Sequence, residues 1–434
     1  METSHAQSLN LRGRAEHLAQ IFLVGVFLFF PMKLGAANTL LALTLLFWLL
    51  SGNFKAKWLA IAHNPITKPA LLMFGLVLIG ATYSIGPTDT ILQAVNKYSK
   101  FLFLLMTLTL LVDAQWRERC WRAFAIAMIL TLASTYAGLW VHVPWAVAAT
   151  PSGWGADHTV FKDYIAQGLL MATFAVLSLT KAFQEKRPLL RACWAGLSVL
   201  ATLSILFLSS GRTGYLSIVV ALSVYAFSIS PKRMRLVVAL TAVLALSTLL
   251  FLSTSANQRI GAIYTEAKLQ LSGPAALKQL DGATSTGARL TMWSFSIDQI
   301  KVRPIFGSGT GSYGTLAKQS CGDAPSCAVV DVHPHNQFLF FGVELGIVGI
   351  LAYIFYLYSA AQGSRRLPDP KRALLLSFLG IMVVDSLVHG ALWLAVENHL
   401  FTFILALLMA EVGASRDHSA DQDDTFSQSL SLNN

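Results

Sequence analysis

Charged residues are scarce in this sequence: Asp, Glu, Lys and Arg make up 12% of its 434 residues, about half the share of an average soluble domain. With 55% hydrophobic residues, this scarcity excludes a soluble cytosolic enzyme and a disordered chain. Cysteine is scarce too, and four residues are too few for a disulfide-stapled scaffold. The formal net charge is +10, but no basic stripe or stacking motif accompanies it, so we expect no nucleic acid as a partner.

The hydrophobic residues instead form blocks that can cross a membrane, which takes about 20 residues per helix. The sequence therefore predicts an all-α polytopic membrane protein with about twelve transmembrane helices. The predicted spans are residues 17–32, 36–51, 69–86, 98–113, 120–144, 162–182, 190–209, 213–230, 235–253, 336–360, 371–392 and 397–412. The chain then divides into helices 1–9 (1–253), a loop region (254–334), helices 10–12 (335–412) and a disordered tail (413–434).

The positive charges predict which side of the membrane each connection faces. Alternate connections hold clusters such as Arg117, Arg119 and Arg122, whereas the others hold few cations, such as Lys33. Because basic loops stay in the cytoplasm, we expect both termini inside and the loop 254–334 in the periplasm. An even number of spans agrees with this orientation. No nucleotide cofactor is then available to residues on the outer face.

The long outer loop carries further local patterns. Apolar residues at helical spacing in 258–271 and 288–300 predict two short amphipathic helices at the membrane surface. The glycine run from Gly307 to Gly314 interrupts this pattern, and it fits a dinucleotide fingerprint only by letter, since no strand precedes it. Cys321 and Cys327 share this loop, where oxidation is possible, and predict a disulfide.

Two histidines and an asparagine lie where this loop enters the tenth predicted helix: His333, His335 and Asn336. Histidine is the commonest general base, which favours a catalytic role. The same residues are also suited to capping the helix, and both interpretations remain open at this point. A metal site formed by Asp331, His333 and His335 is less favoured, because no further carboxylate or cysteine ligand is obvious nearby. We expect no metal.

Two arginines are expected on the same side of the membrane. Arg212 lies between two glycines at the outer mouth of a helix pair, where a buried guanidinium needs an anionic partner and a diphosphate can approach the backbone. The alternative is a snorkelling arginine. Tyr215 follows in the same motif as a supporting residue, and Arg289 begins the second amphipathic helix. With His335, the two arginines form a plausible set of two phosphate clamps and one base.

Three ionisable residues fall inside predicted spans: Glu344, Asp385 and His389. Such residues usually face the interior of a helix bundle and pair with one another. We expect them to support the site by orienting a histidine or an arginine.

These motifs resemble the signature of bacterial O-antigen ligases, a histidine followed by a small polar residue and two glycines. An Arg-x-x-x-Leu element, a loop arginine and the layout of twelve spans are also similar. The positions that carry the resemblance are His335, Asn336, Gly346, Gly349, Arg212, Leu216 and Arg289.

The resemblance implies a GT-C-like, inverting, metal-independent glycosyltransferase of the bacterial inner membrane that needs no cofactor. It would transfer O-antigen glycan from undecaprenyl diphosphate to lipid A–core on the periplasmic side, with His335 as base and Arg212 and Arg289 binding the diphosphate. The superfamily also contains O-antigen polymerases and protein O-oligosaccharyltransferases, which remain alternatives. A lipid-linked glycan transporter is less favoured, because the ionisable residues crowd toward one face of the membrane.

Overall fold

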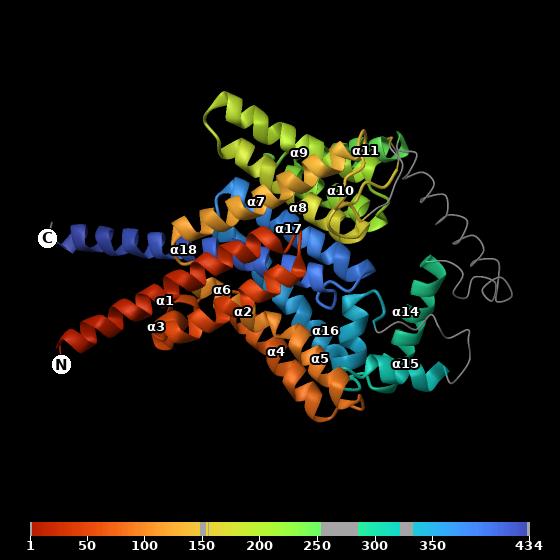
Figure 1. Cartoon of the computed structure of the whole chain (residues 1–434), viewed down its shortest axis with the longest axis horizontal. Coiled ribbons are helices and arrows are strands. Elements are labelled where there is room, and N and C mark those ends of the chain that lie inside the picture. Colours follow the sequence, from red (N-terminus) through yellow and green to blue (C-terminus); the bar gives the residue numbers. More distant parts are fainter. Residues whose placement is uncertain (1, 148–152, 155, 253–284, 322–332, 432–434) are drawn as a thin grey trace.

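The computed structural model describes residues 2–147, 153–154, 156–252, 285–321 and 333–431, and their regular elements are all helical (Figure 1). The helices are α1 (Glu2–Phe29), α2 (Leu34–Ser51), α3 (Phe54–Ile61), α4 (Thr67–Thr82), α5 (Thr88–Tyr98), α6 (Lys100–Leu110), α7 (Ala114–Ala137), α8 (Tyr164–Gln184), α9 (Pro188–Leu208), α10 (Arg212–Ile229), α11 (Arg235–Leu252), α14 (Ser285–Val302), α15 (Tyr313–Cys321), α16 (Gln337–Gly363), the 3-10 turn η2 (Ser364–Arg366), α17 (Asp369–Val388) and α18 (Ala395–Ser431).

A helix coincides with each of the twelve predicted spans, but not all of them meet the length and hydropathy of a membrane span. Among the described residues seven do: α2, α7, α8, α9, α10, α16 and α18. The chain is therefore a multi-pass membrane protein, and the count of twelve stays a prediction. Helix α6, for example, has only 11 residues, too few to cross about 30 Å of hydrocarbon at about 1.5 Å per residue.

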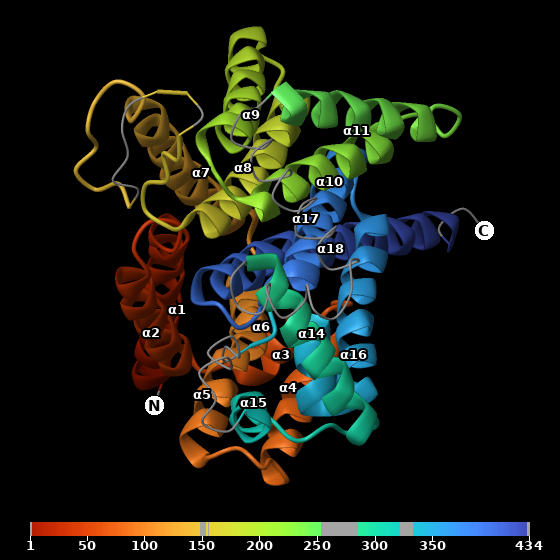
Figure 2. The same ribbon diagram turned by 90° about the vertical axis from the view of Figure 1, so that its right-hand side faces the viewer.

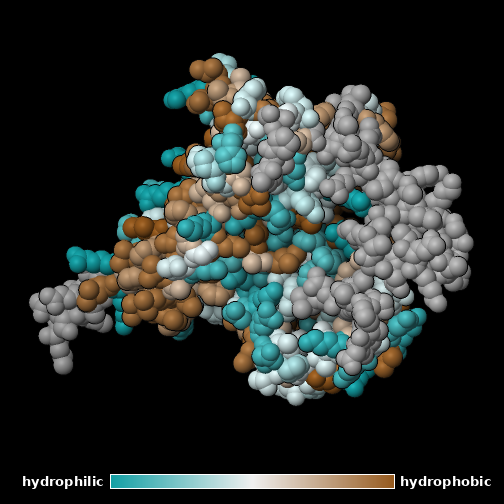
Figure 3. Space-filling model, turned by 45° about the vertical axis from the view of Figure 1, so that its right-hand side comes forward, coloured by the Kyte–Doolittle hydropathy of each residue, from teal (hydrophilic) through white to brown (hydrophobic). Residues whose placement is uncertain are grey.

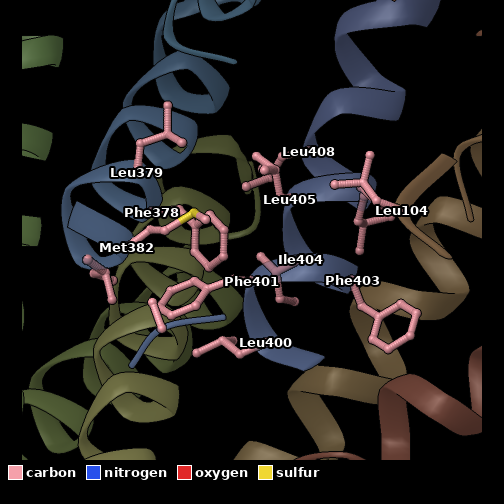
Figure 4. Packing of buried hydrophobic residues seen from close by; sticks show 14 of the residues in the cluster. Leu104, Phe378, Leu379, Met382, Leu400, Phe401, Phe403, Ile404, Leu405 and Leu408 are labelled. Carbon is pink, nitrogen blue, oxygen red and sulfur yellow. The ribbon is translucent and has the colours of Figure 1, made fainter. Parts of the chain in front are cut away.

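The burial of the spans distinguishes the centre of the bundle from its edge. The apolar part of α18 is 89% buried, whereas α2 is 22% buried and leaves most of its hydrophobic surface for lipid. Figure 4 shows why α18 is central: Phe401, Ile404 and Leu405 pack against Phe378 and Met382 of α17. On the space-filling view, hydrophobic side chains cover a broad area near the chain termini, and hydrophilic ones gather toward the middle of this face (Figure 3).

The polar tail differs from the prediction of disorder. Helix α18 does not stop at residue 412 but continues to Ser431. The tail follows a stable helix directly, and no Gly or Pro beyond Gly413 interrupts it, so the helix can propagate without a new nucleation step. Both marked ends of the chain lie at the same end of the bundle, as an even number of spans requires (Figure 1).

The outer region is only partly described. Helix α14 confirms a helix at 288–300, whereas its amphipathic character stays a prediction, and it lies beside α16 with α15 nearby (Figure 2). The segment 258–271 lies outside the described residues. The short helices α3, α5 and α15 were not predicted.

The residues 303–312, which include most of the glycine run, form successive turns that dock against a break in α16. Inside this helix Gly346 has φ 68° and ψ −161°, which interrupts the helical hydrogen bonding. The segment of turns supplies replacements: Ile347 N–H donates to Pro304 O at 2.8 Å, and Gly309 N–H donates to Glu344 O at 2.8 Å. The opposite side of the segment bonds to α4, where Thr310 N–H donates to Gly80 O at 3.1 Å.

At this contact both the available space and the backbone conformation require glycine, in the segment and in α16. A methyl group on Gly309 would lie 2.2 Å from Ser84 Cα, and one on Gly346 would lie 2.2 Å from Ile305 O. Both residues have positive φ. The glycine run is therefore a structural wedge between α4, α5 and α16, which accounts for its pattern without a nucleotide.

Candidate functional site

The loop that enters α16 is held by three hydrogen bonds. Asn336 caps the helix, because its Oδ1 accepts the Leu339 N–H at 3.0 Å, and its Nδ2 donates to Leu387 O at the end of α17 at 3.0 Å. On the other side Trp293 Nε1 of α14 donates to Pro334 O at 2.9 Å. The capping interpretation is thus confirmed for Asn336.

His335 has an unusual backbone conformation. Its φ is +49°, in the left-handed region that residues other than glycine rarely adopt and that is often found at functional sites. Its N–H donates to His333 Nδ1 at 3.2 Å, so that neutral His333 carries its proton on Nε2. The loop geometry therefore fixes both imidazoles.

Three imidazoles meet beside this loop. The ring centroids of His333 and His335 are 4.2 Å apart, and those of His335 and His389 are 5.3 Å apart. His389 lies directly after α17, so the loop before α16 and the end of α17 contribute to one cluster.

Two buried carboxylates flank His389. Its Nδ1 is 3.5 Å from Asp385 Oδ1 and 3.7 Å from Glu397 Oε1. Neither oxygen of Asp385 has a hydrogen-bond partner within the described part of the chain, although the residue is fully buried. Buried polar groups are normally satisfied, so this cluster has the character of a binding site rather than of a packed core.

The two arginines face the same region. Arg289 and Trp293 are one turn apart on α14, so the bond from Trp293 to Pro334 holds Arg289 beside the histidine loop. Burial lowers the pKa of Arg289, and the positive charge of Arg212 at the start of α10 lowers it further. The negative charge of Asp385 raises the pKa of Arg289. Arg289 is therefore close enough to interact electrostatically with Arg212, with Asp385 and with His389 of the histidine cluster.

The structure shows which groups two of the expected supporting residues, Glu344 and Tyr215, bind. Glu344 Oε1 accepts the Gly311 N–H at 2.8 Å, so this buried carboxylate holds the glycine wedge, and no hydrogen bond or ion pair joins it to a histidine or arginine among the described residues. Tyr215 donates its hydroxyl to Ser209 O at 2.5 Å and so ties the first turn of α10 to the end of α9. Its contact steadies the loop that precedes Arg212.

Two predictions concern residues outside the described part. Asp331 and Cys327 lie outside it, as does the side chain of Cys321, so the metal alternative and the disulfide stay untested there. Within the described residues no three His, Cys, Asp or Glu side chains are grouped as metal ligands. Cys120 and Cys193 are free thiols.

Sequence reasoning missed two charged residues of this region. Glu397 lies in the first turn of α18 and is 3% exposed, and the same search for ionisable residues in apolar spans could have found it. Burial lowers the pKa of Lys162, while Asp163 and Glu397 oppose this shift. Lys162 thus adds a third cation near the carboxylates, and no local motif marks it.

Comparison with known proteins agrees with this geometry. Residues 197–354 match the family model described as O-Antigen ligase. This segment of the chain is therefore similar to O-antigen ligases. The matched segment includes Arg212, Arg289 and His335, whereas Asp385 and His389 lie beyond it.

A curated relative of this chain is an uncharacterized protein of Haemophilus influenzae. The two are 27% identical over 187 residues, which cover 42% of this chain and 46% of the relative. The chain therefore matches less than half of the length of that relative.

Proposed function

We propose that the protein is an O-antigen ligase, a glycosyltransferase that moves O-antigen polysaccharide from undecaprenyl diphosphate to lipid A–core. The observation that supports this most directly is the electrostatic interaction of Arg289 with Arg212 and with His389 of the histidine cluster. The positive charge of Arg212 lowers the pKa of Arg289, which indicates that the two guanidinium groups lie close enough to act on one anion. A diphosphate is an anion that two such groups can bind together.

In the proposed reaction His335 is the general base. Its imidazole accepts the proton of an acceptor hydroxyl while the oxygen attacks the anomeric carbon, and the bond from that carbon to the diphosphate oxygen breaks. In-line attack inverts the anomeric centre. Arg212 and Arg289 neutralise the charge that the diphosphate gains. Asp385 and Glu397 stabilise His389 next to the base, and no metal or other cofactor takes part.

The site is proposed to face the periplasm of the bacterial inner membrane, with both termini in the cytoplasm. The basic connections of the sequence support this orientation. The energy for transfer is already stored in the glycosyl diphosphate bond, so no nucleotide is needed on that side. Both substrates are anchored to lipid, and bringing them together in one cleft contributes to the rate.

The proposal is tested by transfer in vitro from an undecaprenyl diphosphate-linked glycan to purified lipid A–core. His335→Ala should lower the rate by about 10²–10⁴-fold, the usual contribution of a general base. His63→Ala, at an exposed histidine outside the cluster, is the matched control and should keep the wild-type rate. A wild-type rate in His335→Ala would exclude this role for the residue.

The same assay separates the alternatives. A polymerase would extend glycan on the carrier and leave lipid A–core unmodified, and a protein O-oligosaccharyltransferase would label a protein instead. Loss of activity in EDTA, with recovery after a divalent cation is added, would favour metal catalysis over the proposed mechanism.

A further inference from the structure

An apolar cavity of about 520 Å³ lies between α2, α3, α4 and α6. Its lining includes Trp48, Trp58, Leu71, Leu102 and Met106. Trp58 is 48% exposed, Leu71 38% and Leu102 39%, so the cavity opens along the outside of the bundle. An open apolar cavity on the lipid-facing surface of a membrane protein has the chemistry of a site for a hydrocarbon chain.

A second cavity of about 290 Å³ adjoins the first, because Ile61 lines both. It differs in polarity, since its lining includes Asn64 and Arg117. Helix α6 lines the first cavity as far as Thr109, and the second cavity is lined by Leu108 and by Val112 just beyond the helix, so the two cavities adjoin at the end of α6. An apolar cavity followed by a polar one with a guanidinium matches an amphiphile with an anionic head.

The charges of this part of the chain agree with such a ligand. Between Lys33 and Thr88 the sequence contains no Asp or Glu, but it places Lys55, Lys57 and Lys68 around α3. Lys57 is buried, and its ammonium lies 5.0 Å from the ring of Trp48, which lines the first cavity. It donates to Trp48 O at 3.2 Å and to Ser51 Oγ.

The carboxylate of Glu16 acts on the charge of Lys57. Glu16 of α1 raises the pKa of Lys57, opposing the effect of burial, but within the described residues no ion pair joins Lys57 to an acid. The positive charge around α3 is therefore only partly compensated. Exposed Phe54 and Trp58 on the same helix are typical of a membrane–water interface.

We propose that the two cavities bind one anionic membrane phospholipid. An acyl chain fills the apolar cavity, and the phosphate lies in the polar cavity beside Arg117. Basic pockets between transmembrane helices bind the anionic head groups of lipids in other membrane proteins. Helix α3 lies at the end of the bundle that carries the chain termini, opposite α14 (Figure 1), so this site is separate from the proposed catalytic region.

The test is native mass spectrometry of the purified full chain, titrated with phosphatidylglycerol or phosphatidylcholine. The wild type should retain one phosphatidylglycerol with at least about tenfold preference, the effect of one charge-assisted contact. Arg117→Gln should remove this preference. Arg119→Gln, at an exposed arginine two residues along the same helix and outside both cavities, is the control and should preserve it.

A second variant tests the acyl-chain cavity without changing charge. Leu102→Trp, at a partly exposed rim position that can accept a larger side chain, should reduce retention of both lipids. The proposal is wrong if phosphatidylglycerol binds no better than phosphatidylcholine, or if Arg117→Gln and Leu102→Trp both retain lipid as the wild type does. Co-purification of a polyprenyl phosphate in place of the phospholipid would also overturn it.

Discussion

Gly346→Ala should be far more harmful than a glycine-to-alanine change usually is. Gly346 combines φ 68° with ψ −161°, a region that is essentially restricted to glycine and costs other residues about 1–3 kcal/mol. The added methyl would also lie 2.2 Å from Ile305 O, so the backbone must move. That movement would break the bonds from Ile347 N to Pro304 O and from Val348 N to Ile305 O, each worth about 0.5–1.5 kcal/mol.

Together these effects amount to about 2–6 kcal/mol of stability, which should lower Tm by at least about 2 °C for a chain of 434 residues. The measurement is a thermal melt of the purified protein in detergent, paired with the transfer assay. Gly196→Ala in α9 is the matched control, because nothing lies within 4 Å of its added methyl, and it should be neutral or slightly stabilising. If Gly346→Ala has the same Tm as Gly196→Ala and transfers glycan at the wild-type rate, the structural role proposed for Gly346 and the glycine wedge is wrong.

Three further predictions concern the site and its loop. Arg212→Lys and Arg289→Lys should each keep part of the transfer rate that the alanine variants lose, because lysine keeps the charge but not the bidentate fork; equal rates for lysine and alanine variants would contradict this. Asn336→Ala should lower stability by about 0.5–2 kcal/mol through loss of the cap at Leu339, whereas Asn336→Asp should retain most of it in the same thermal melt. Peptide mapping without reductant should recover Cys321 and Cys327 as one linked peptide, and finding both as free thiols would disprove the disulfide.

The helices could be predicted from sequence because their signal is local. Apolar blocks of membrane-spanning length need no distant contacts to be recognised, and each of the twelve coincides with a helix. The positive charges also predict that Arg212, Arg289 and His335 lie on one face of the membrane, and this grouping stays a prediction. Local pattern therefore identified the helices.

The parts that depend on long-range backbone contacts could not be predicted. Glu344 was expected to orient a histidine or an arginine, yet it accepts a hydrogen bond from Gly311, which is 33 residues away in the sequence. The glycine run offered no local sign of its partners on α4 and α16. Glu397 was missed for another reason, since it begins α18 rather than lying deep in the apolar stretch.

The bond from the Asn336 side chain to Leu387 O has a mechanical consequence. It joins the start of α16 to the last turn of α17, so His335 and the pair of Asp385 and His389 travel as one rigid unit. A hinge between these two helices is therefore a poor way to admit a substrate. Entry from the side of α14, which contacts this unit through Trp293, leaves the spacing of base and carboxylate intact during each turnover.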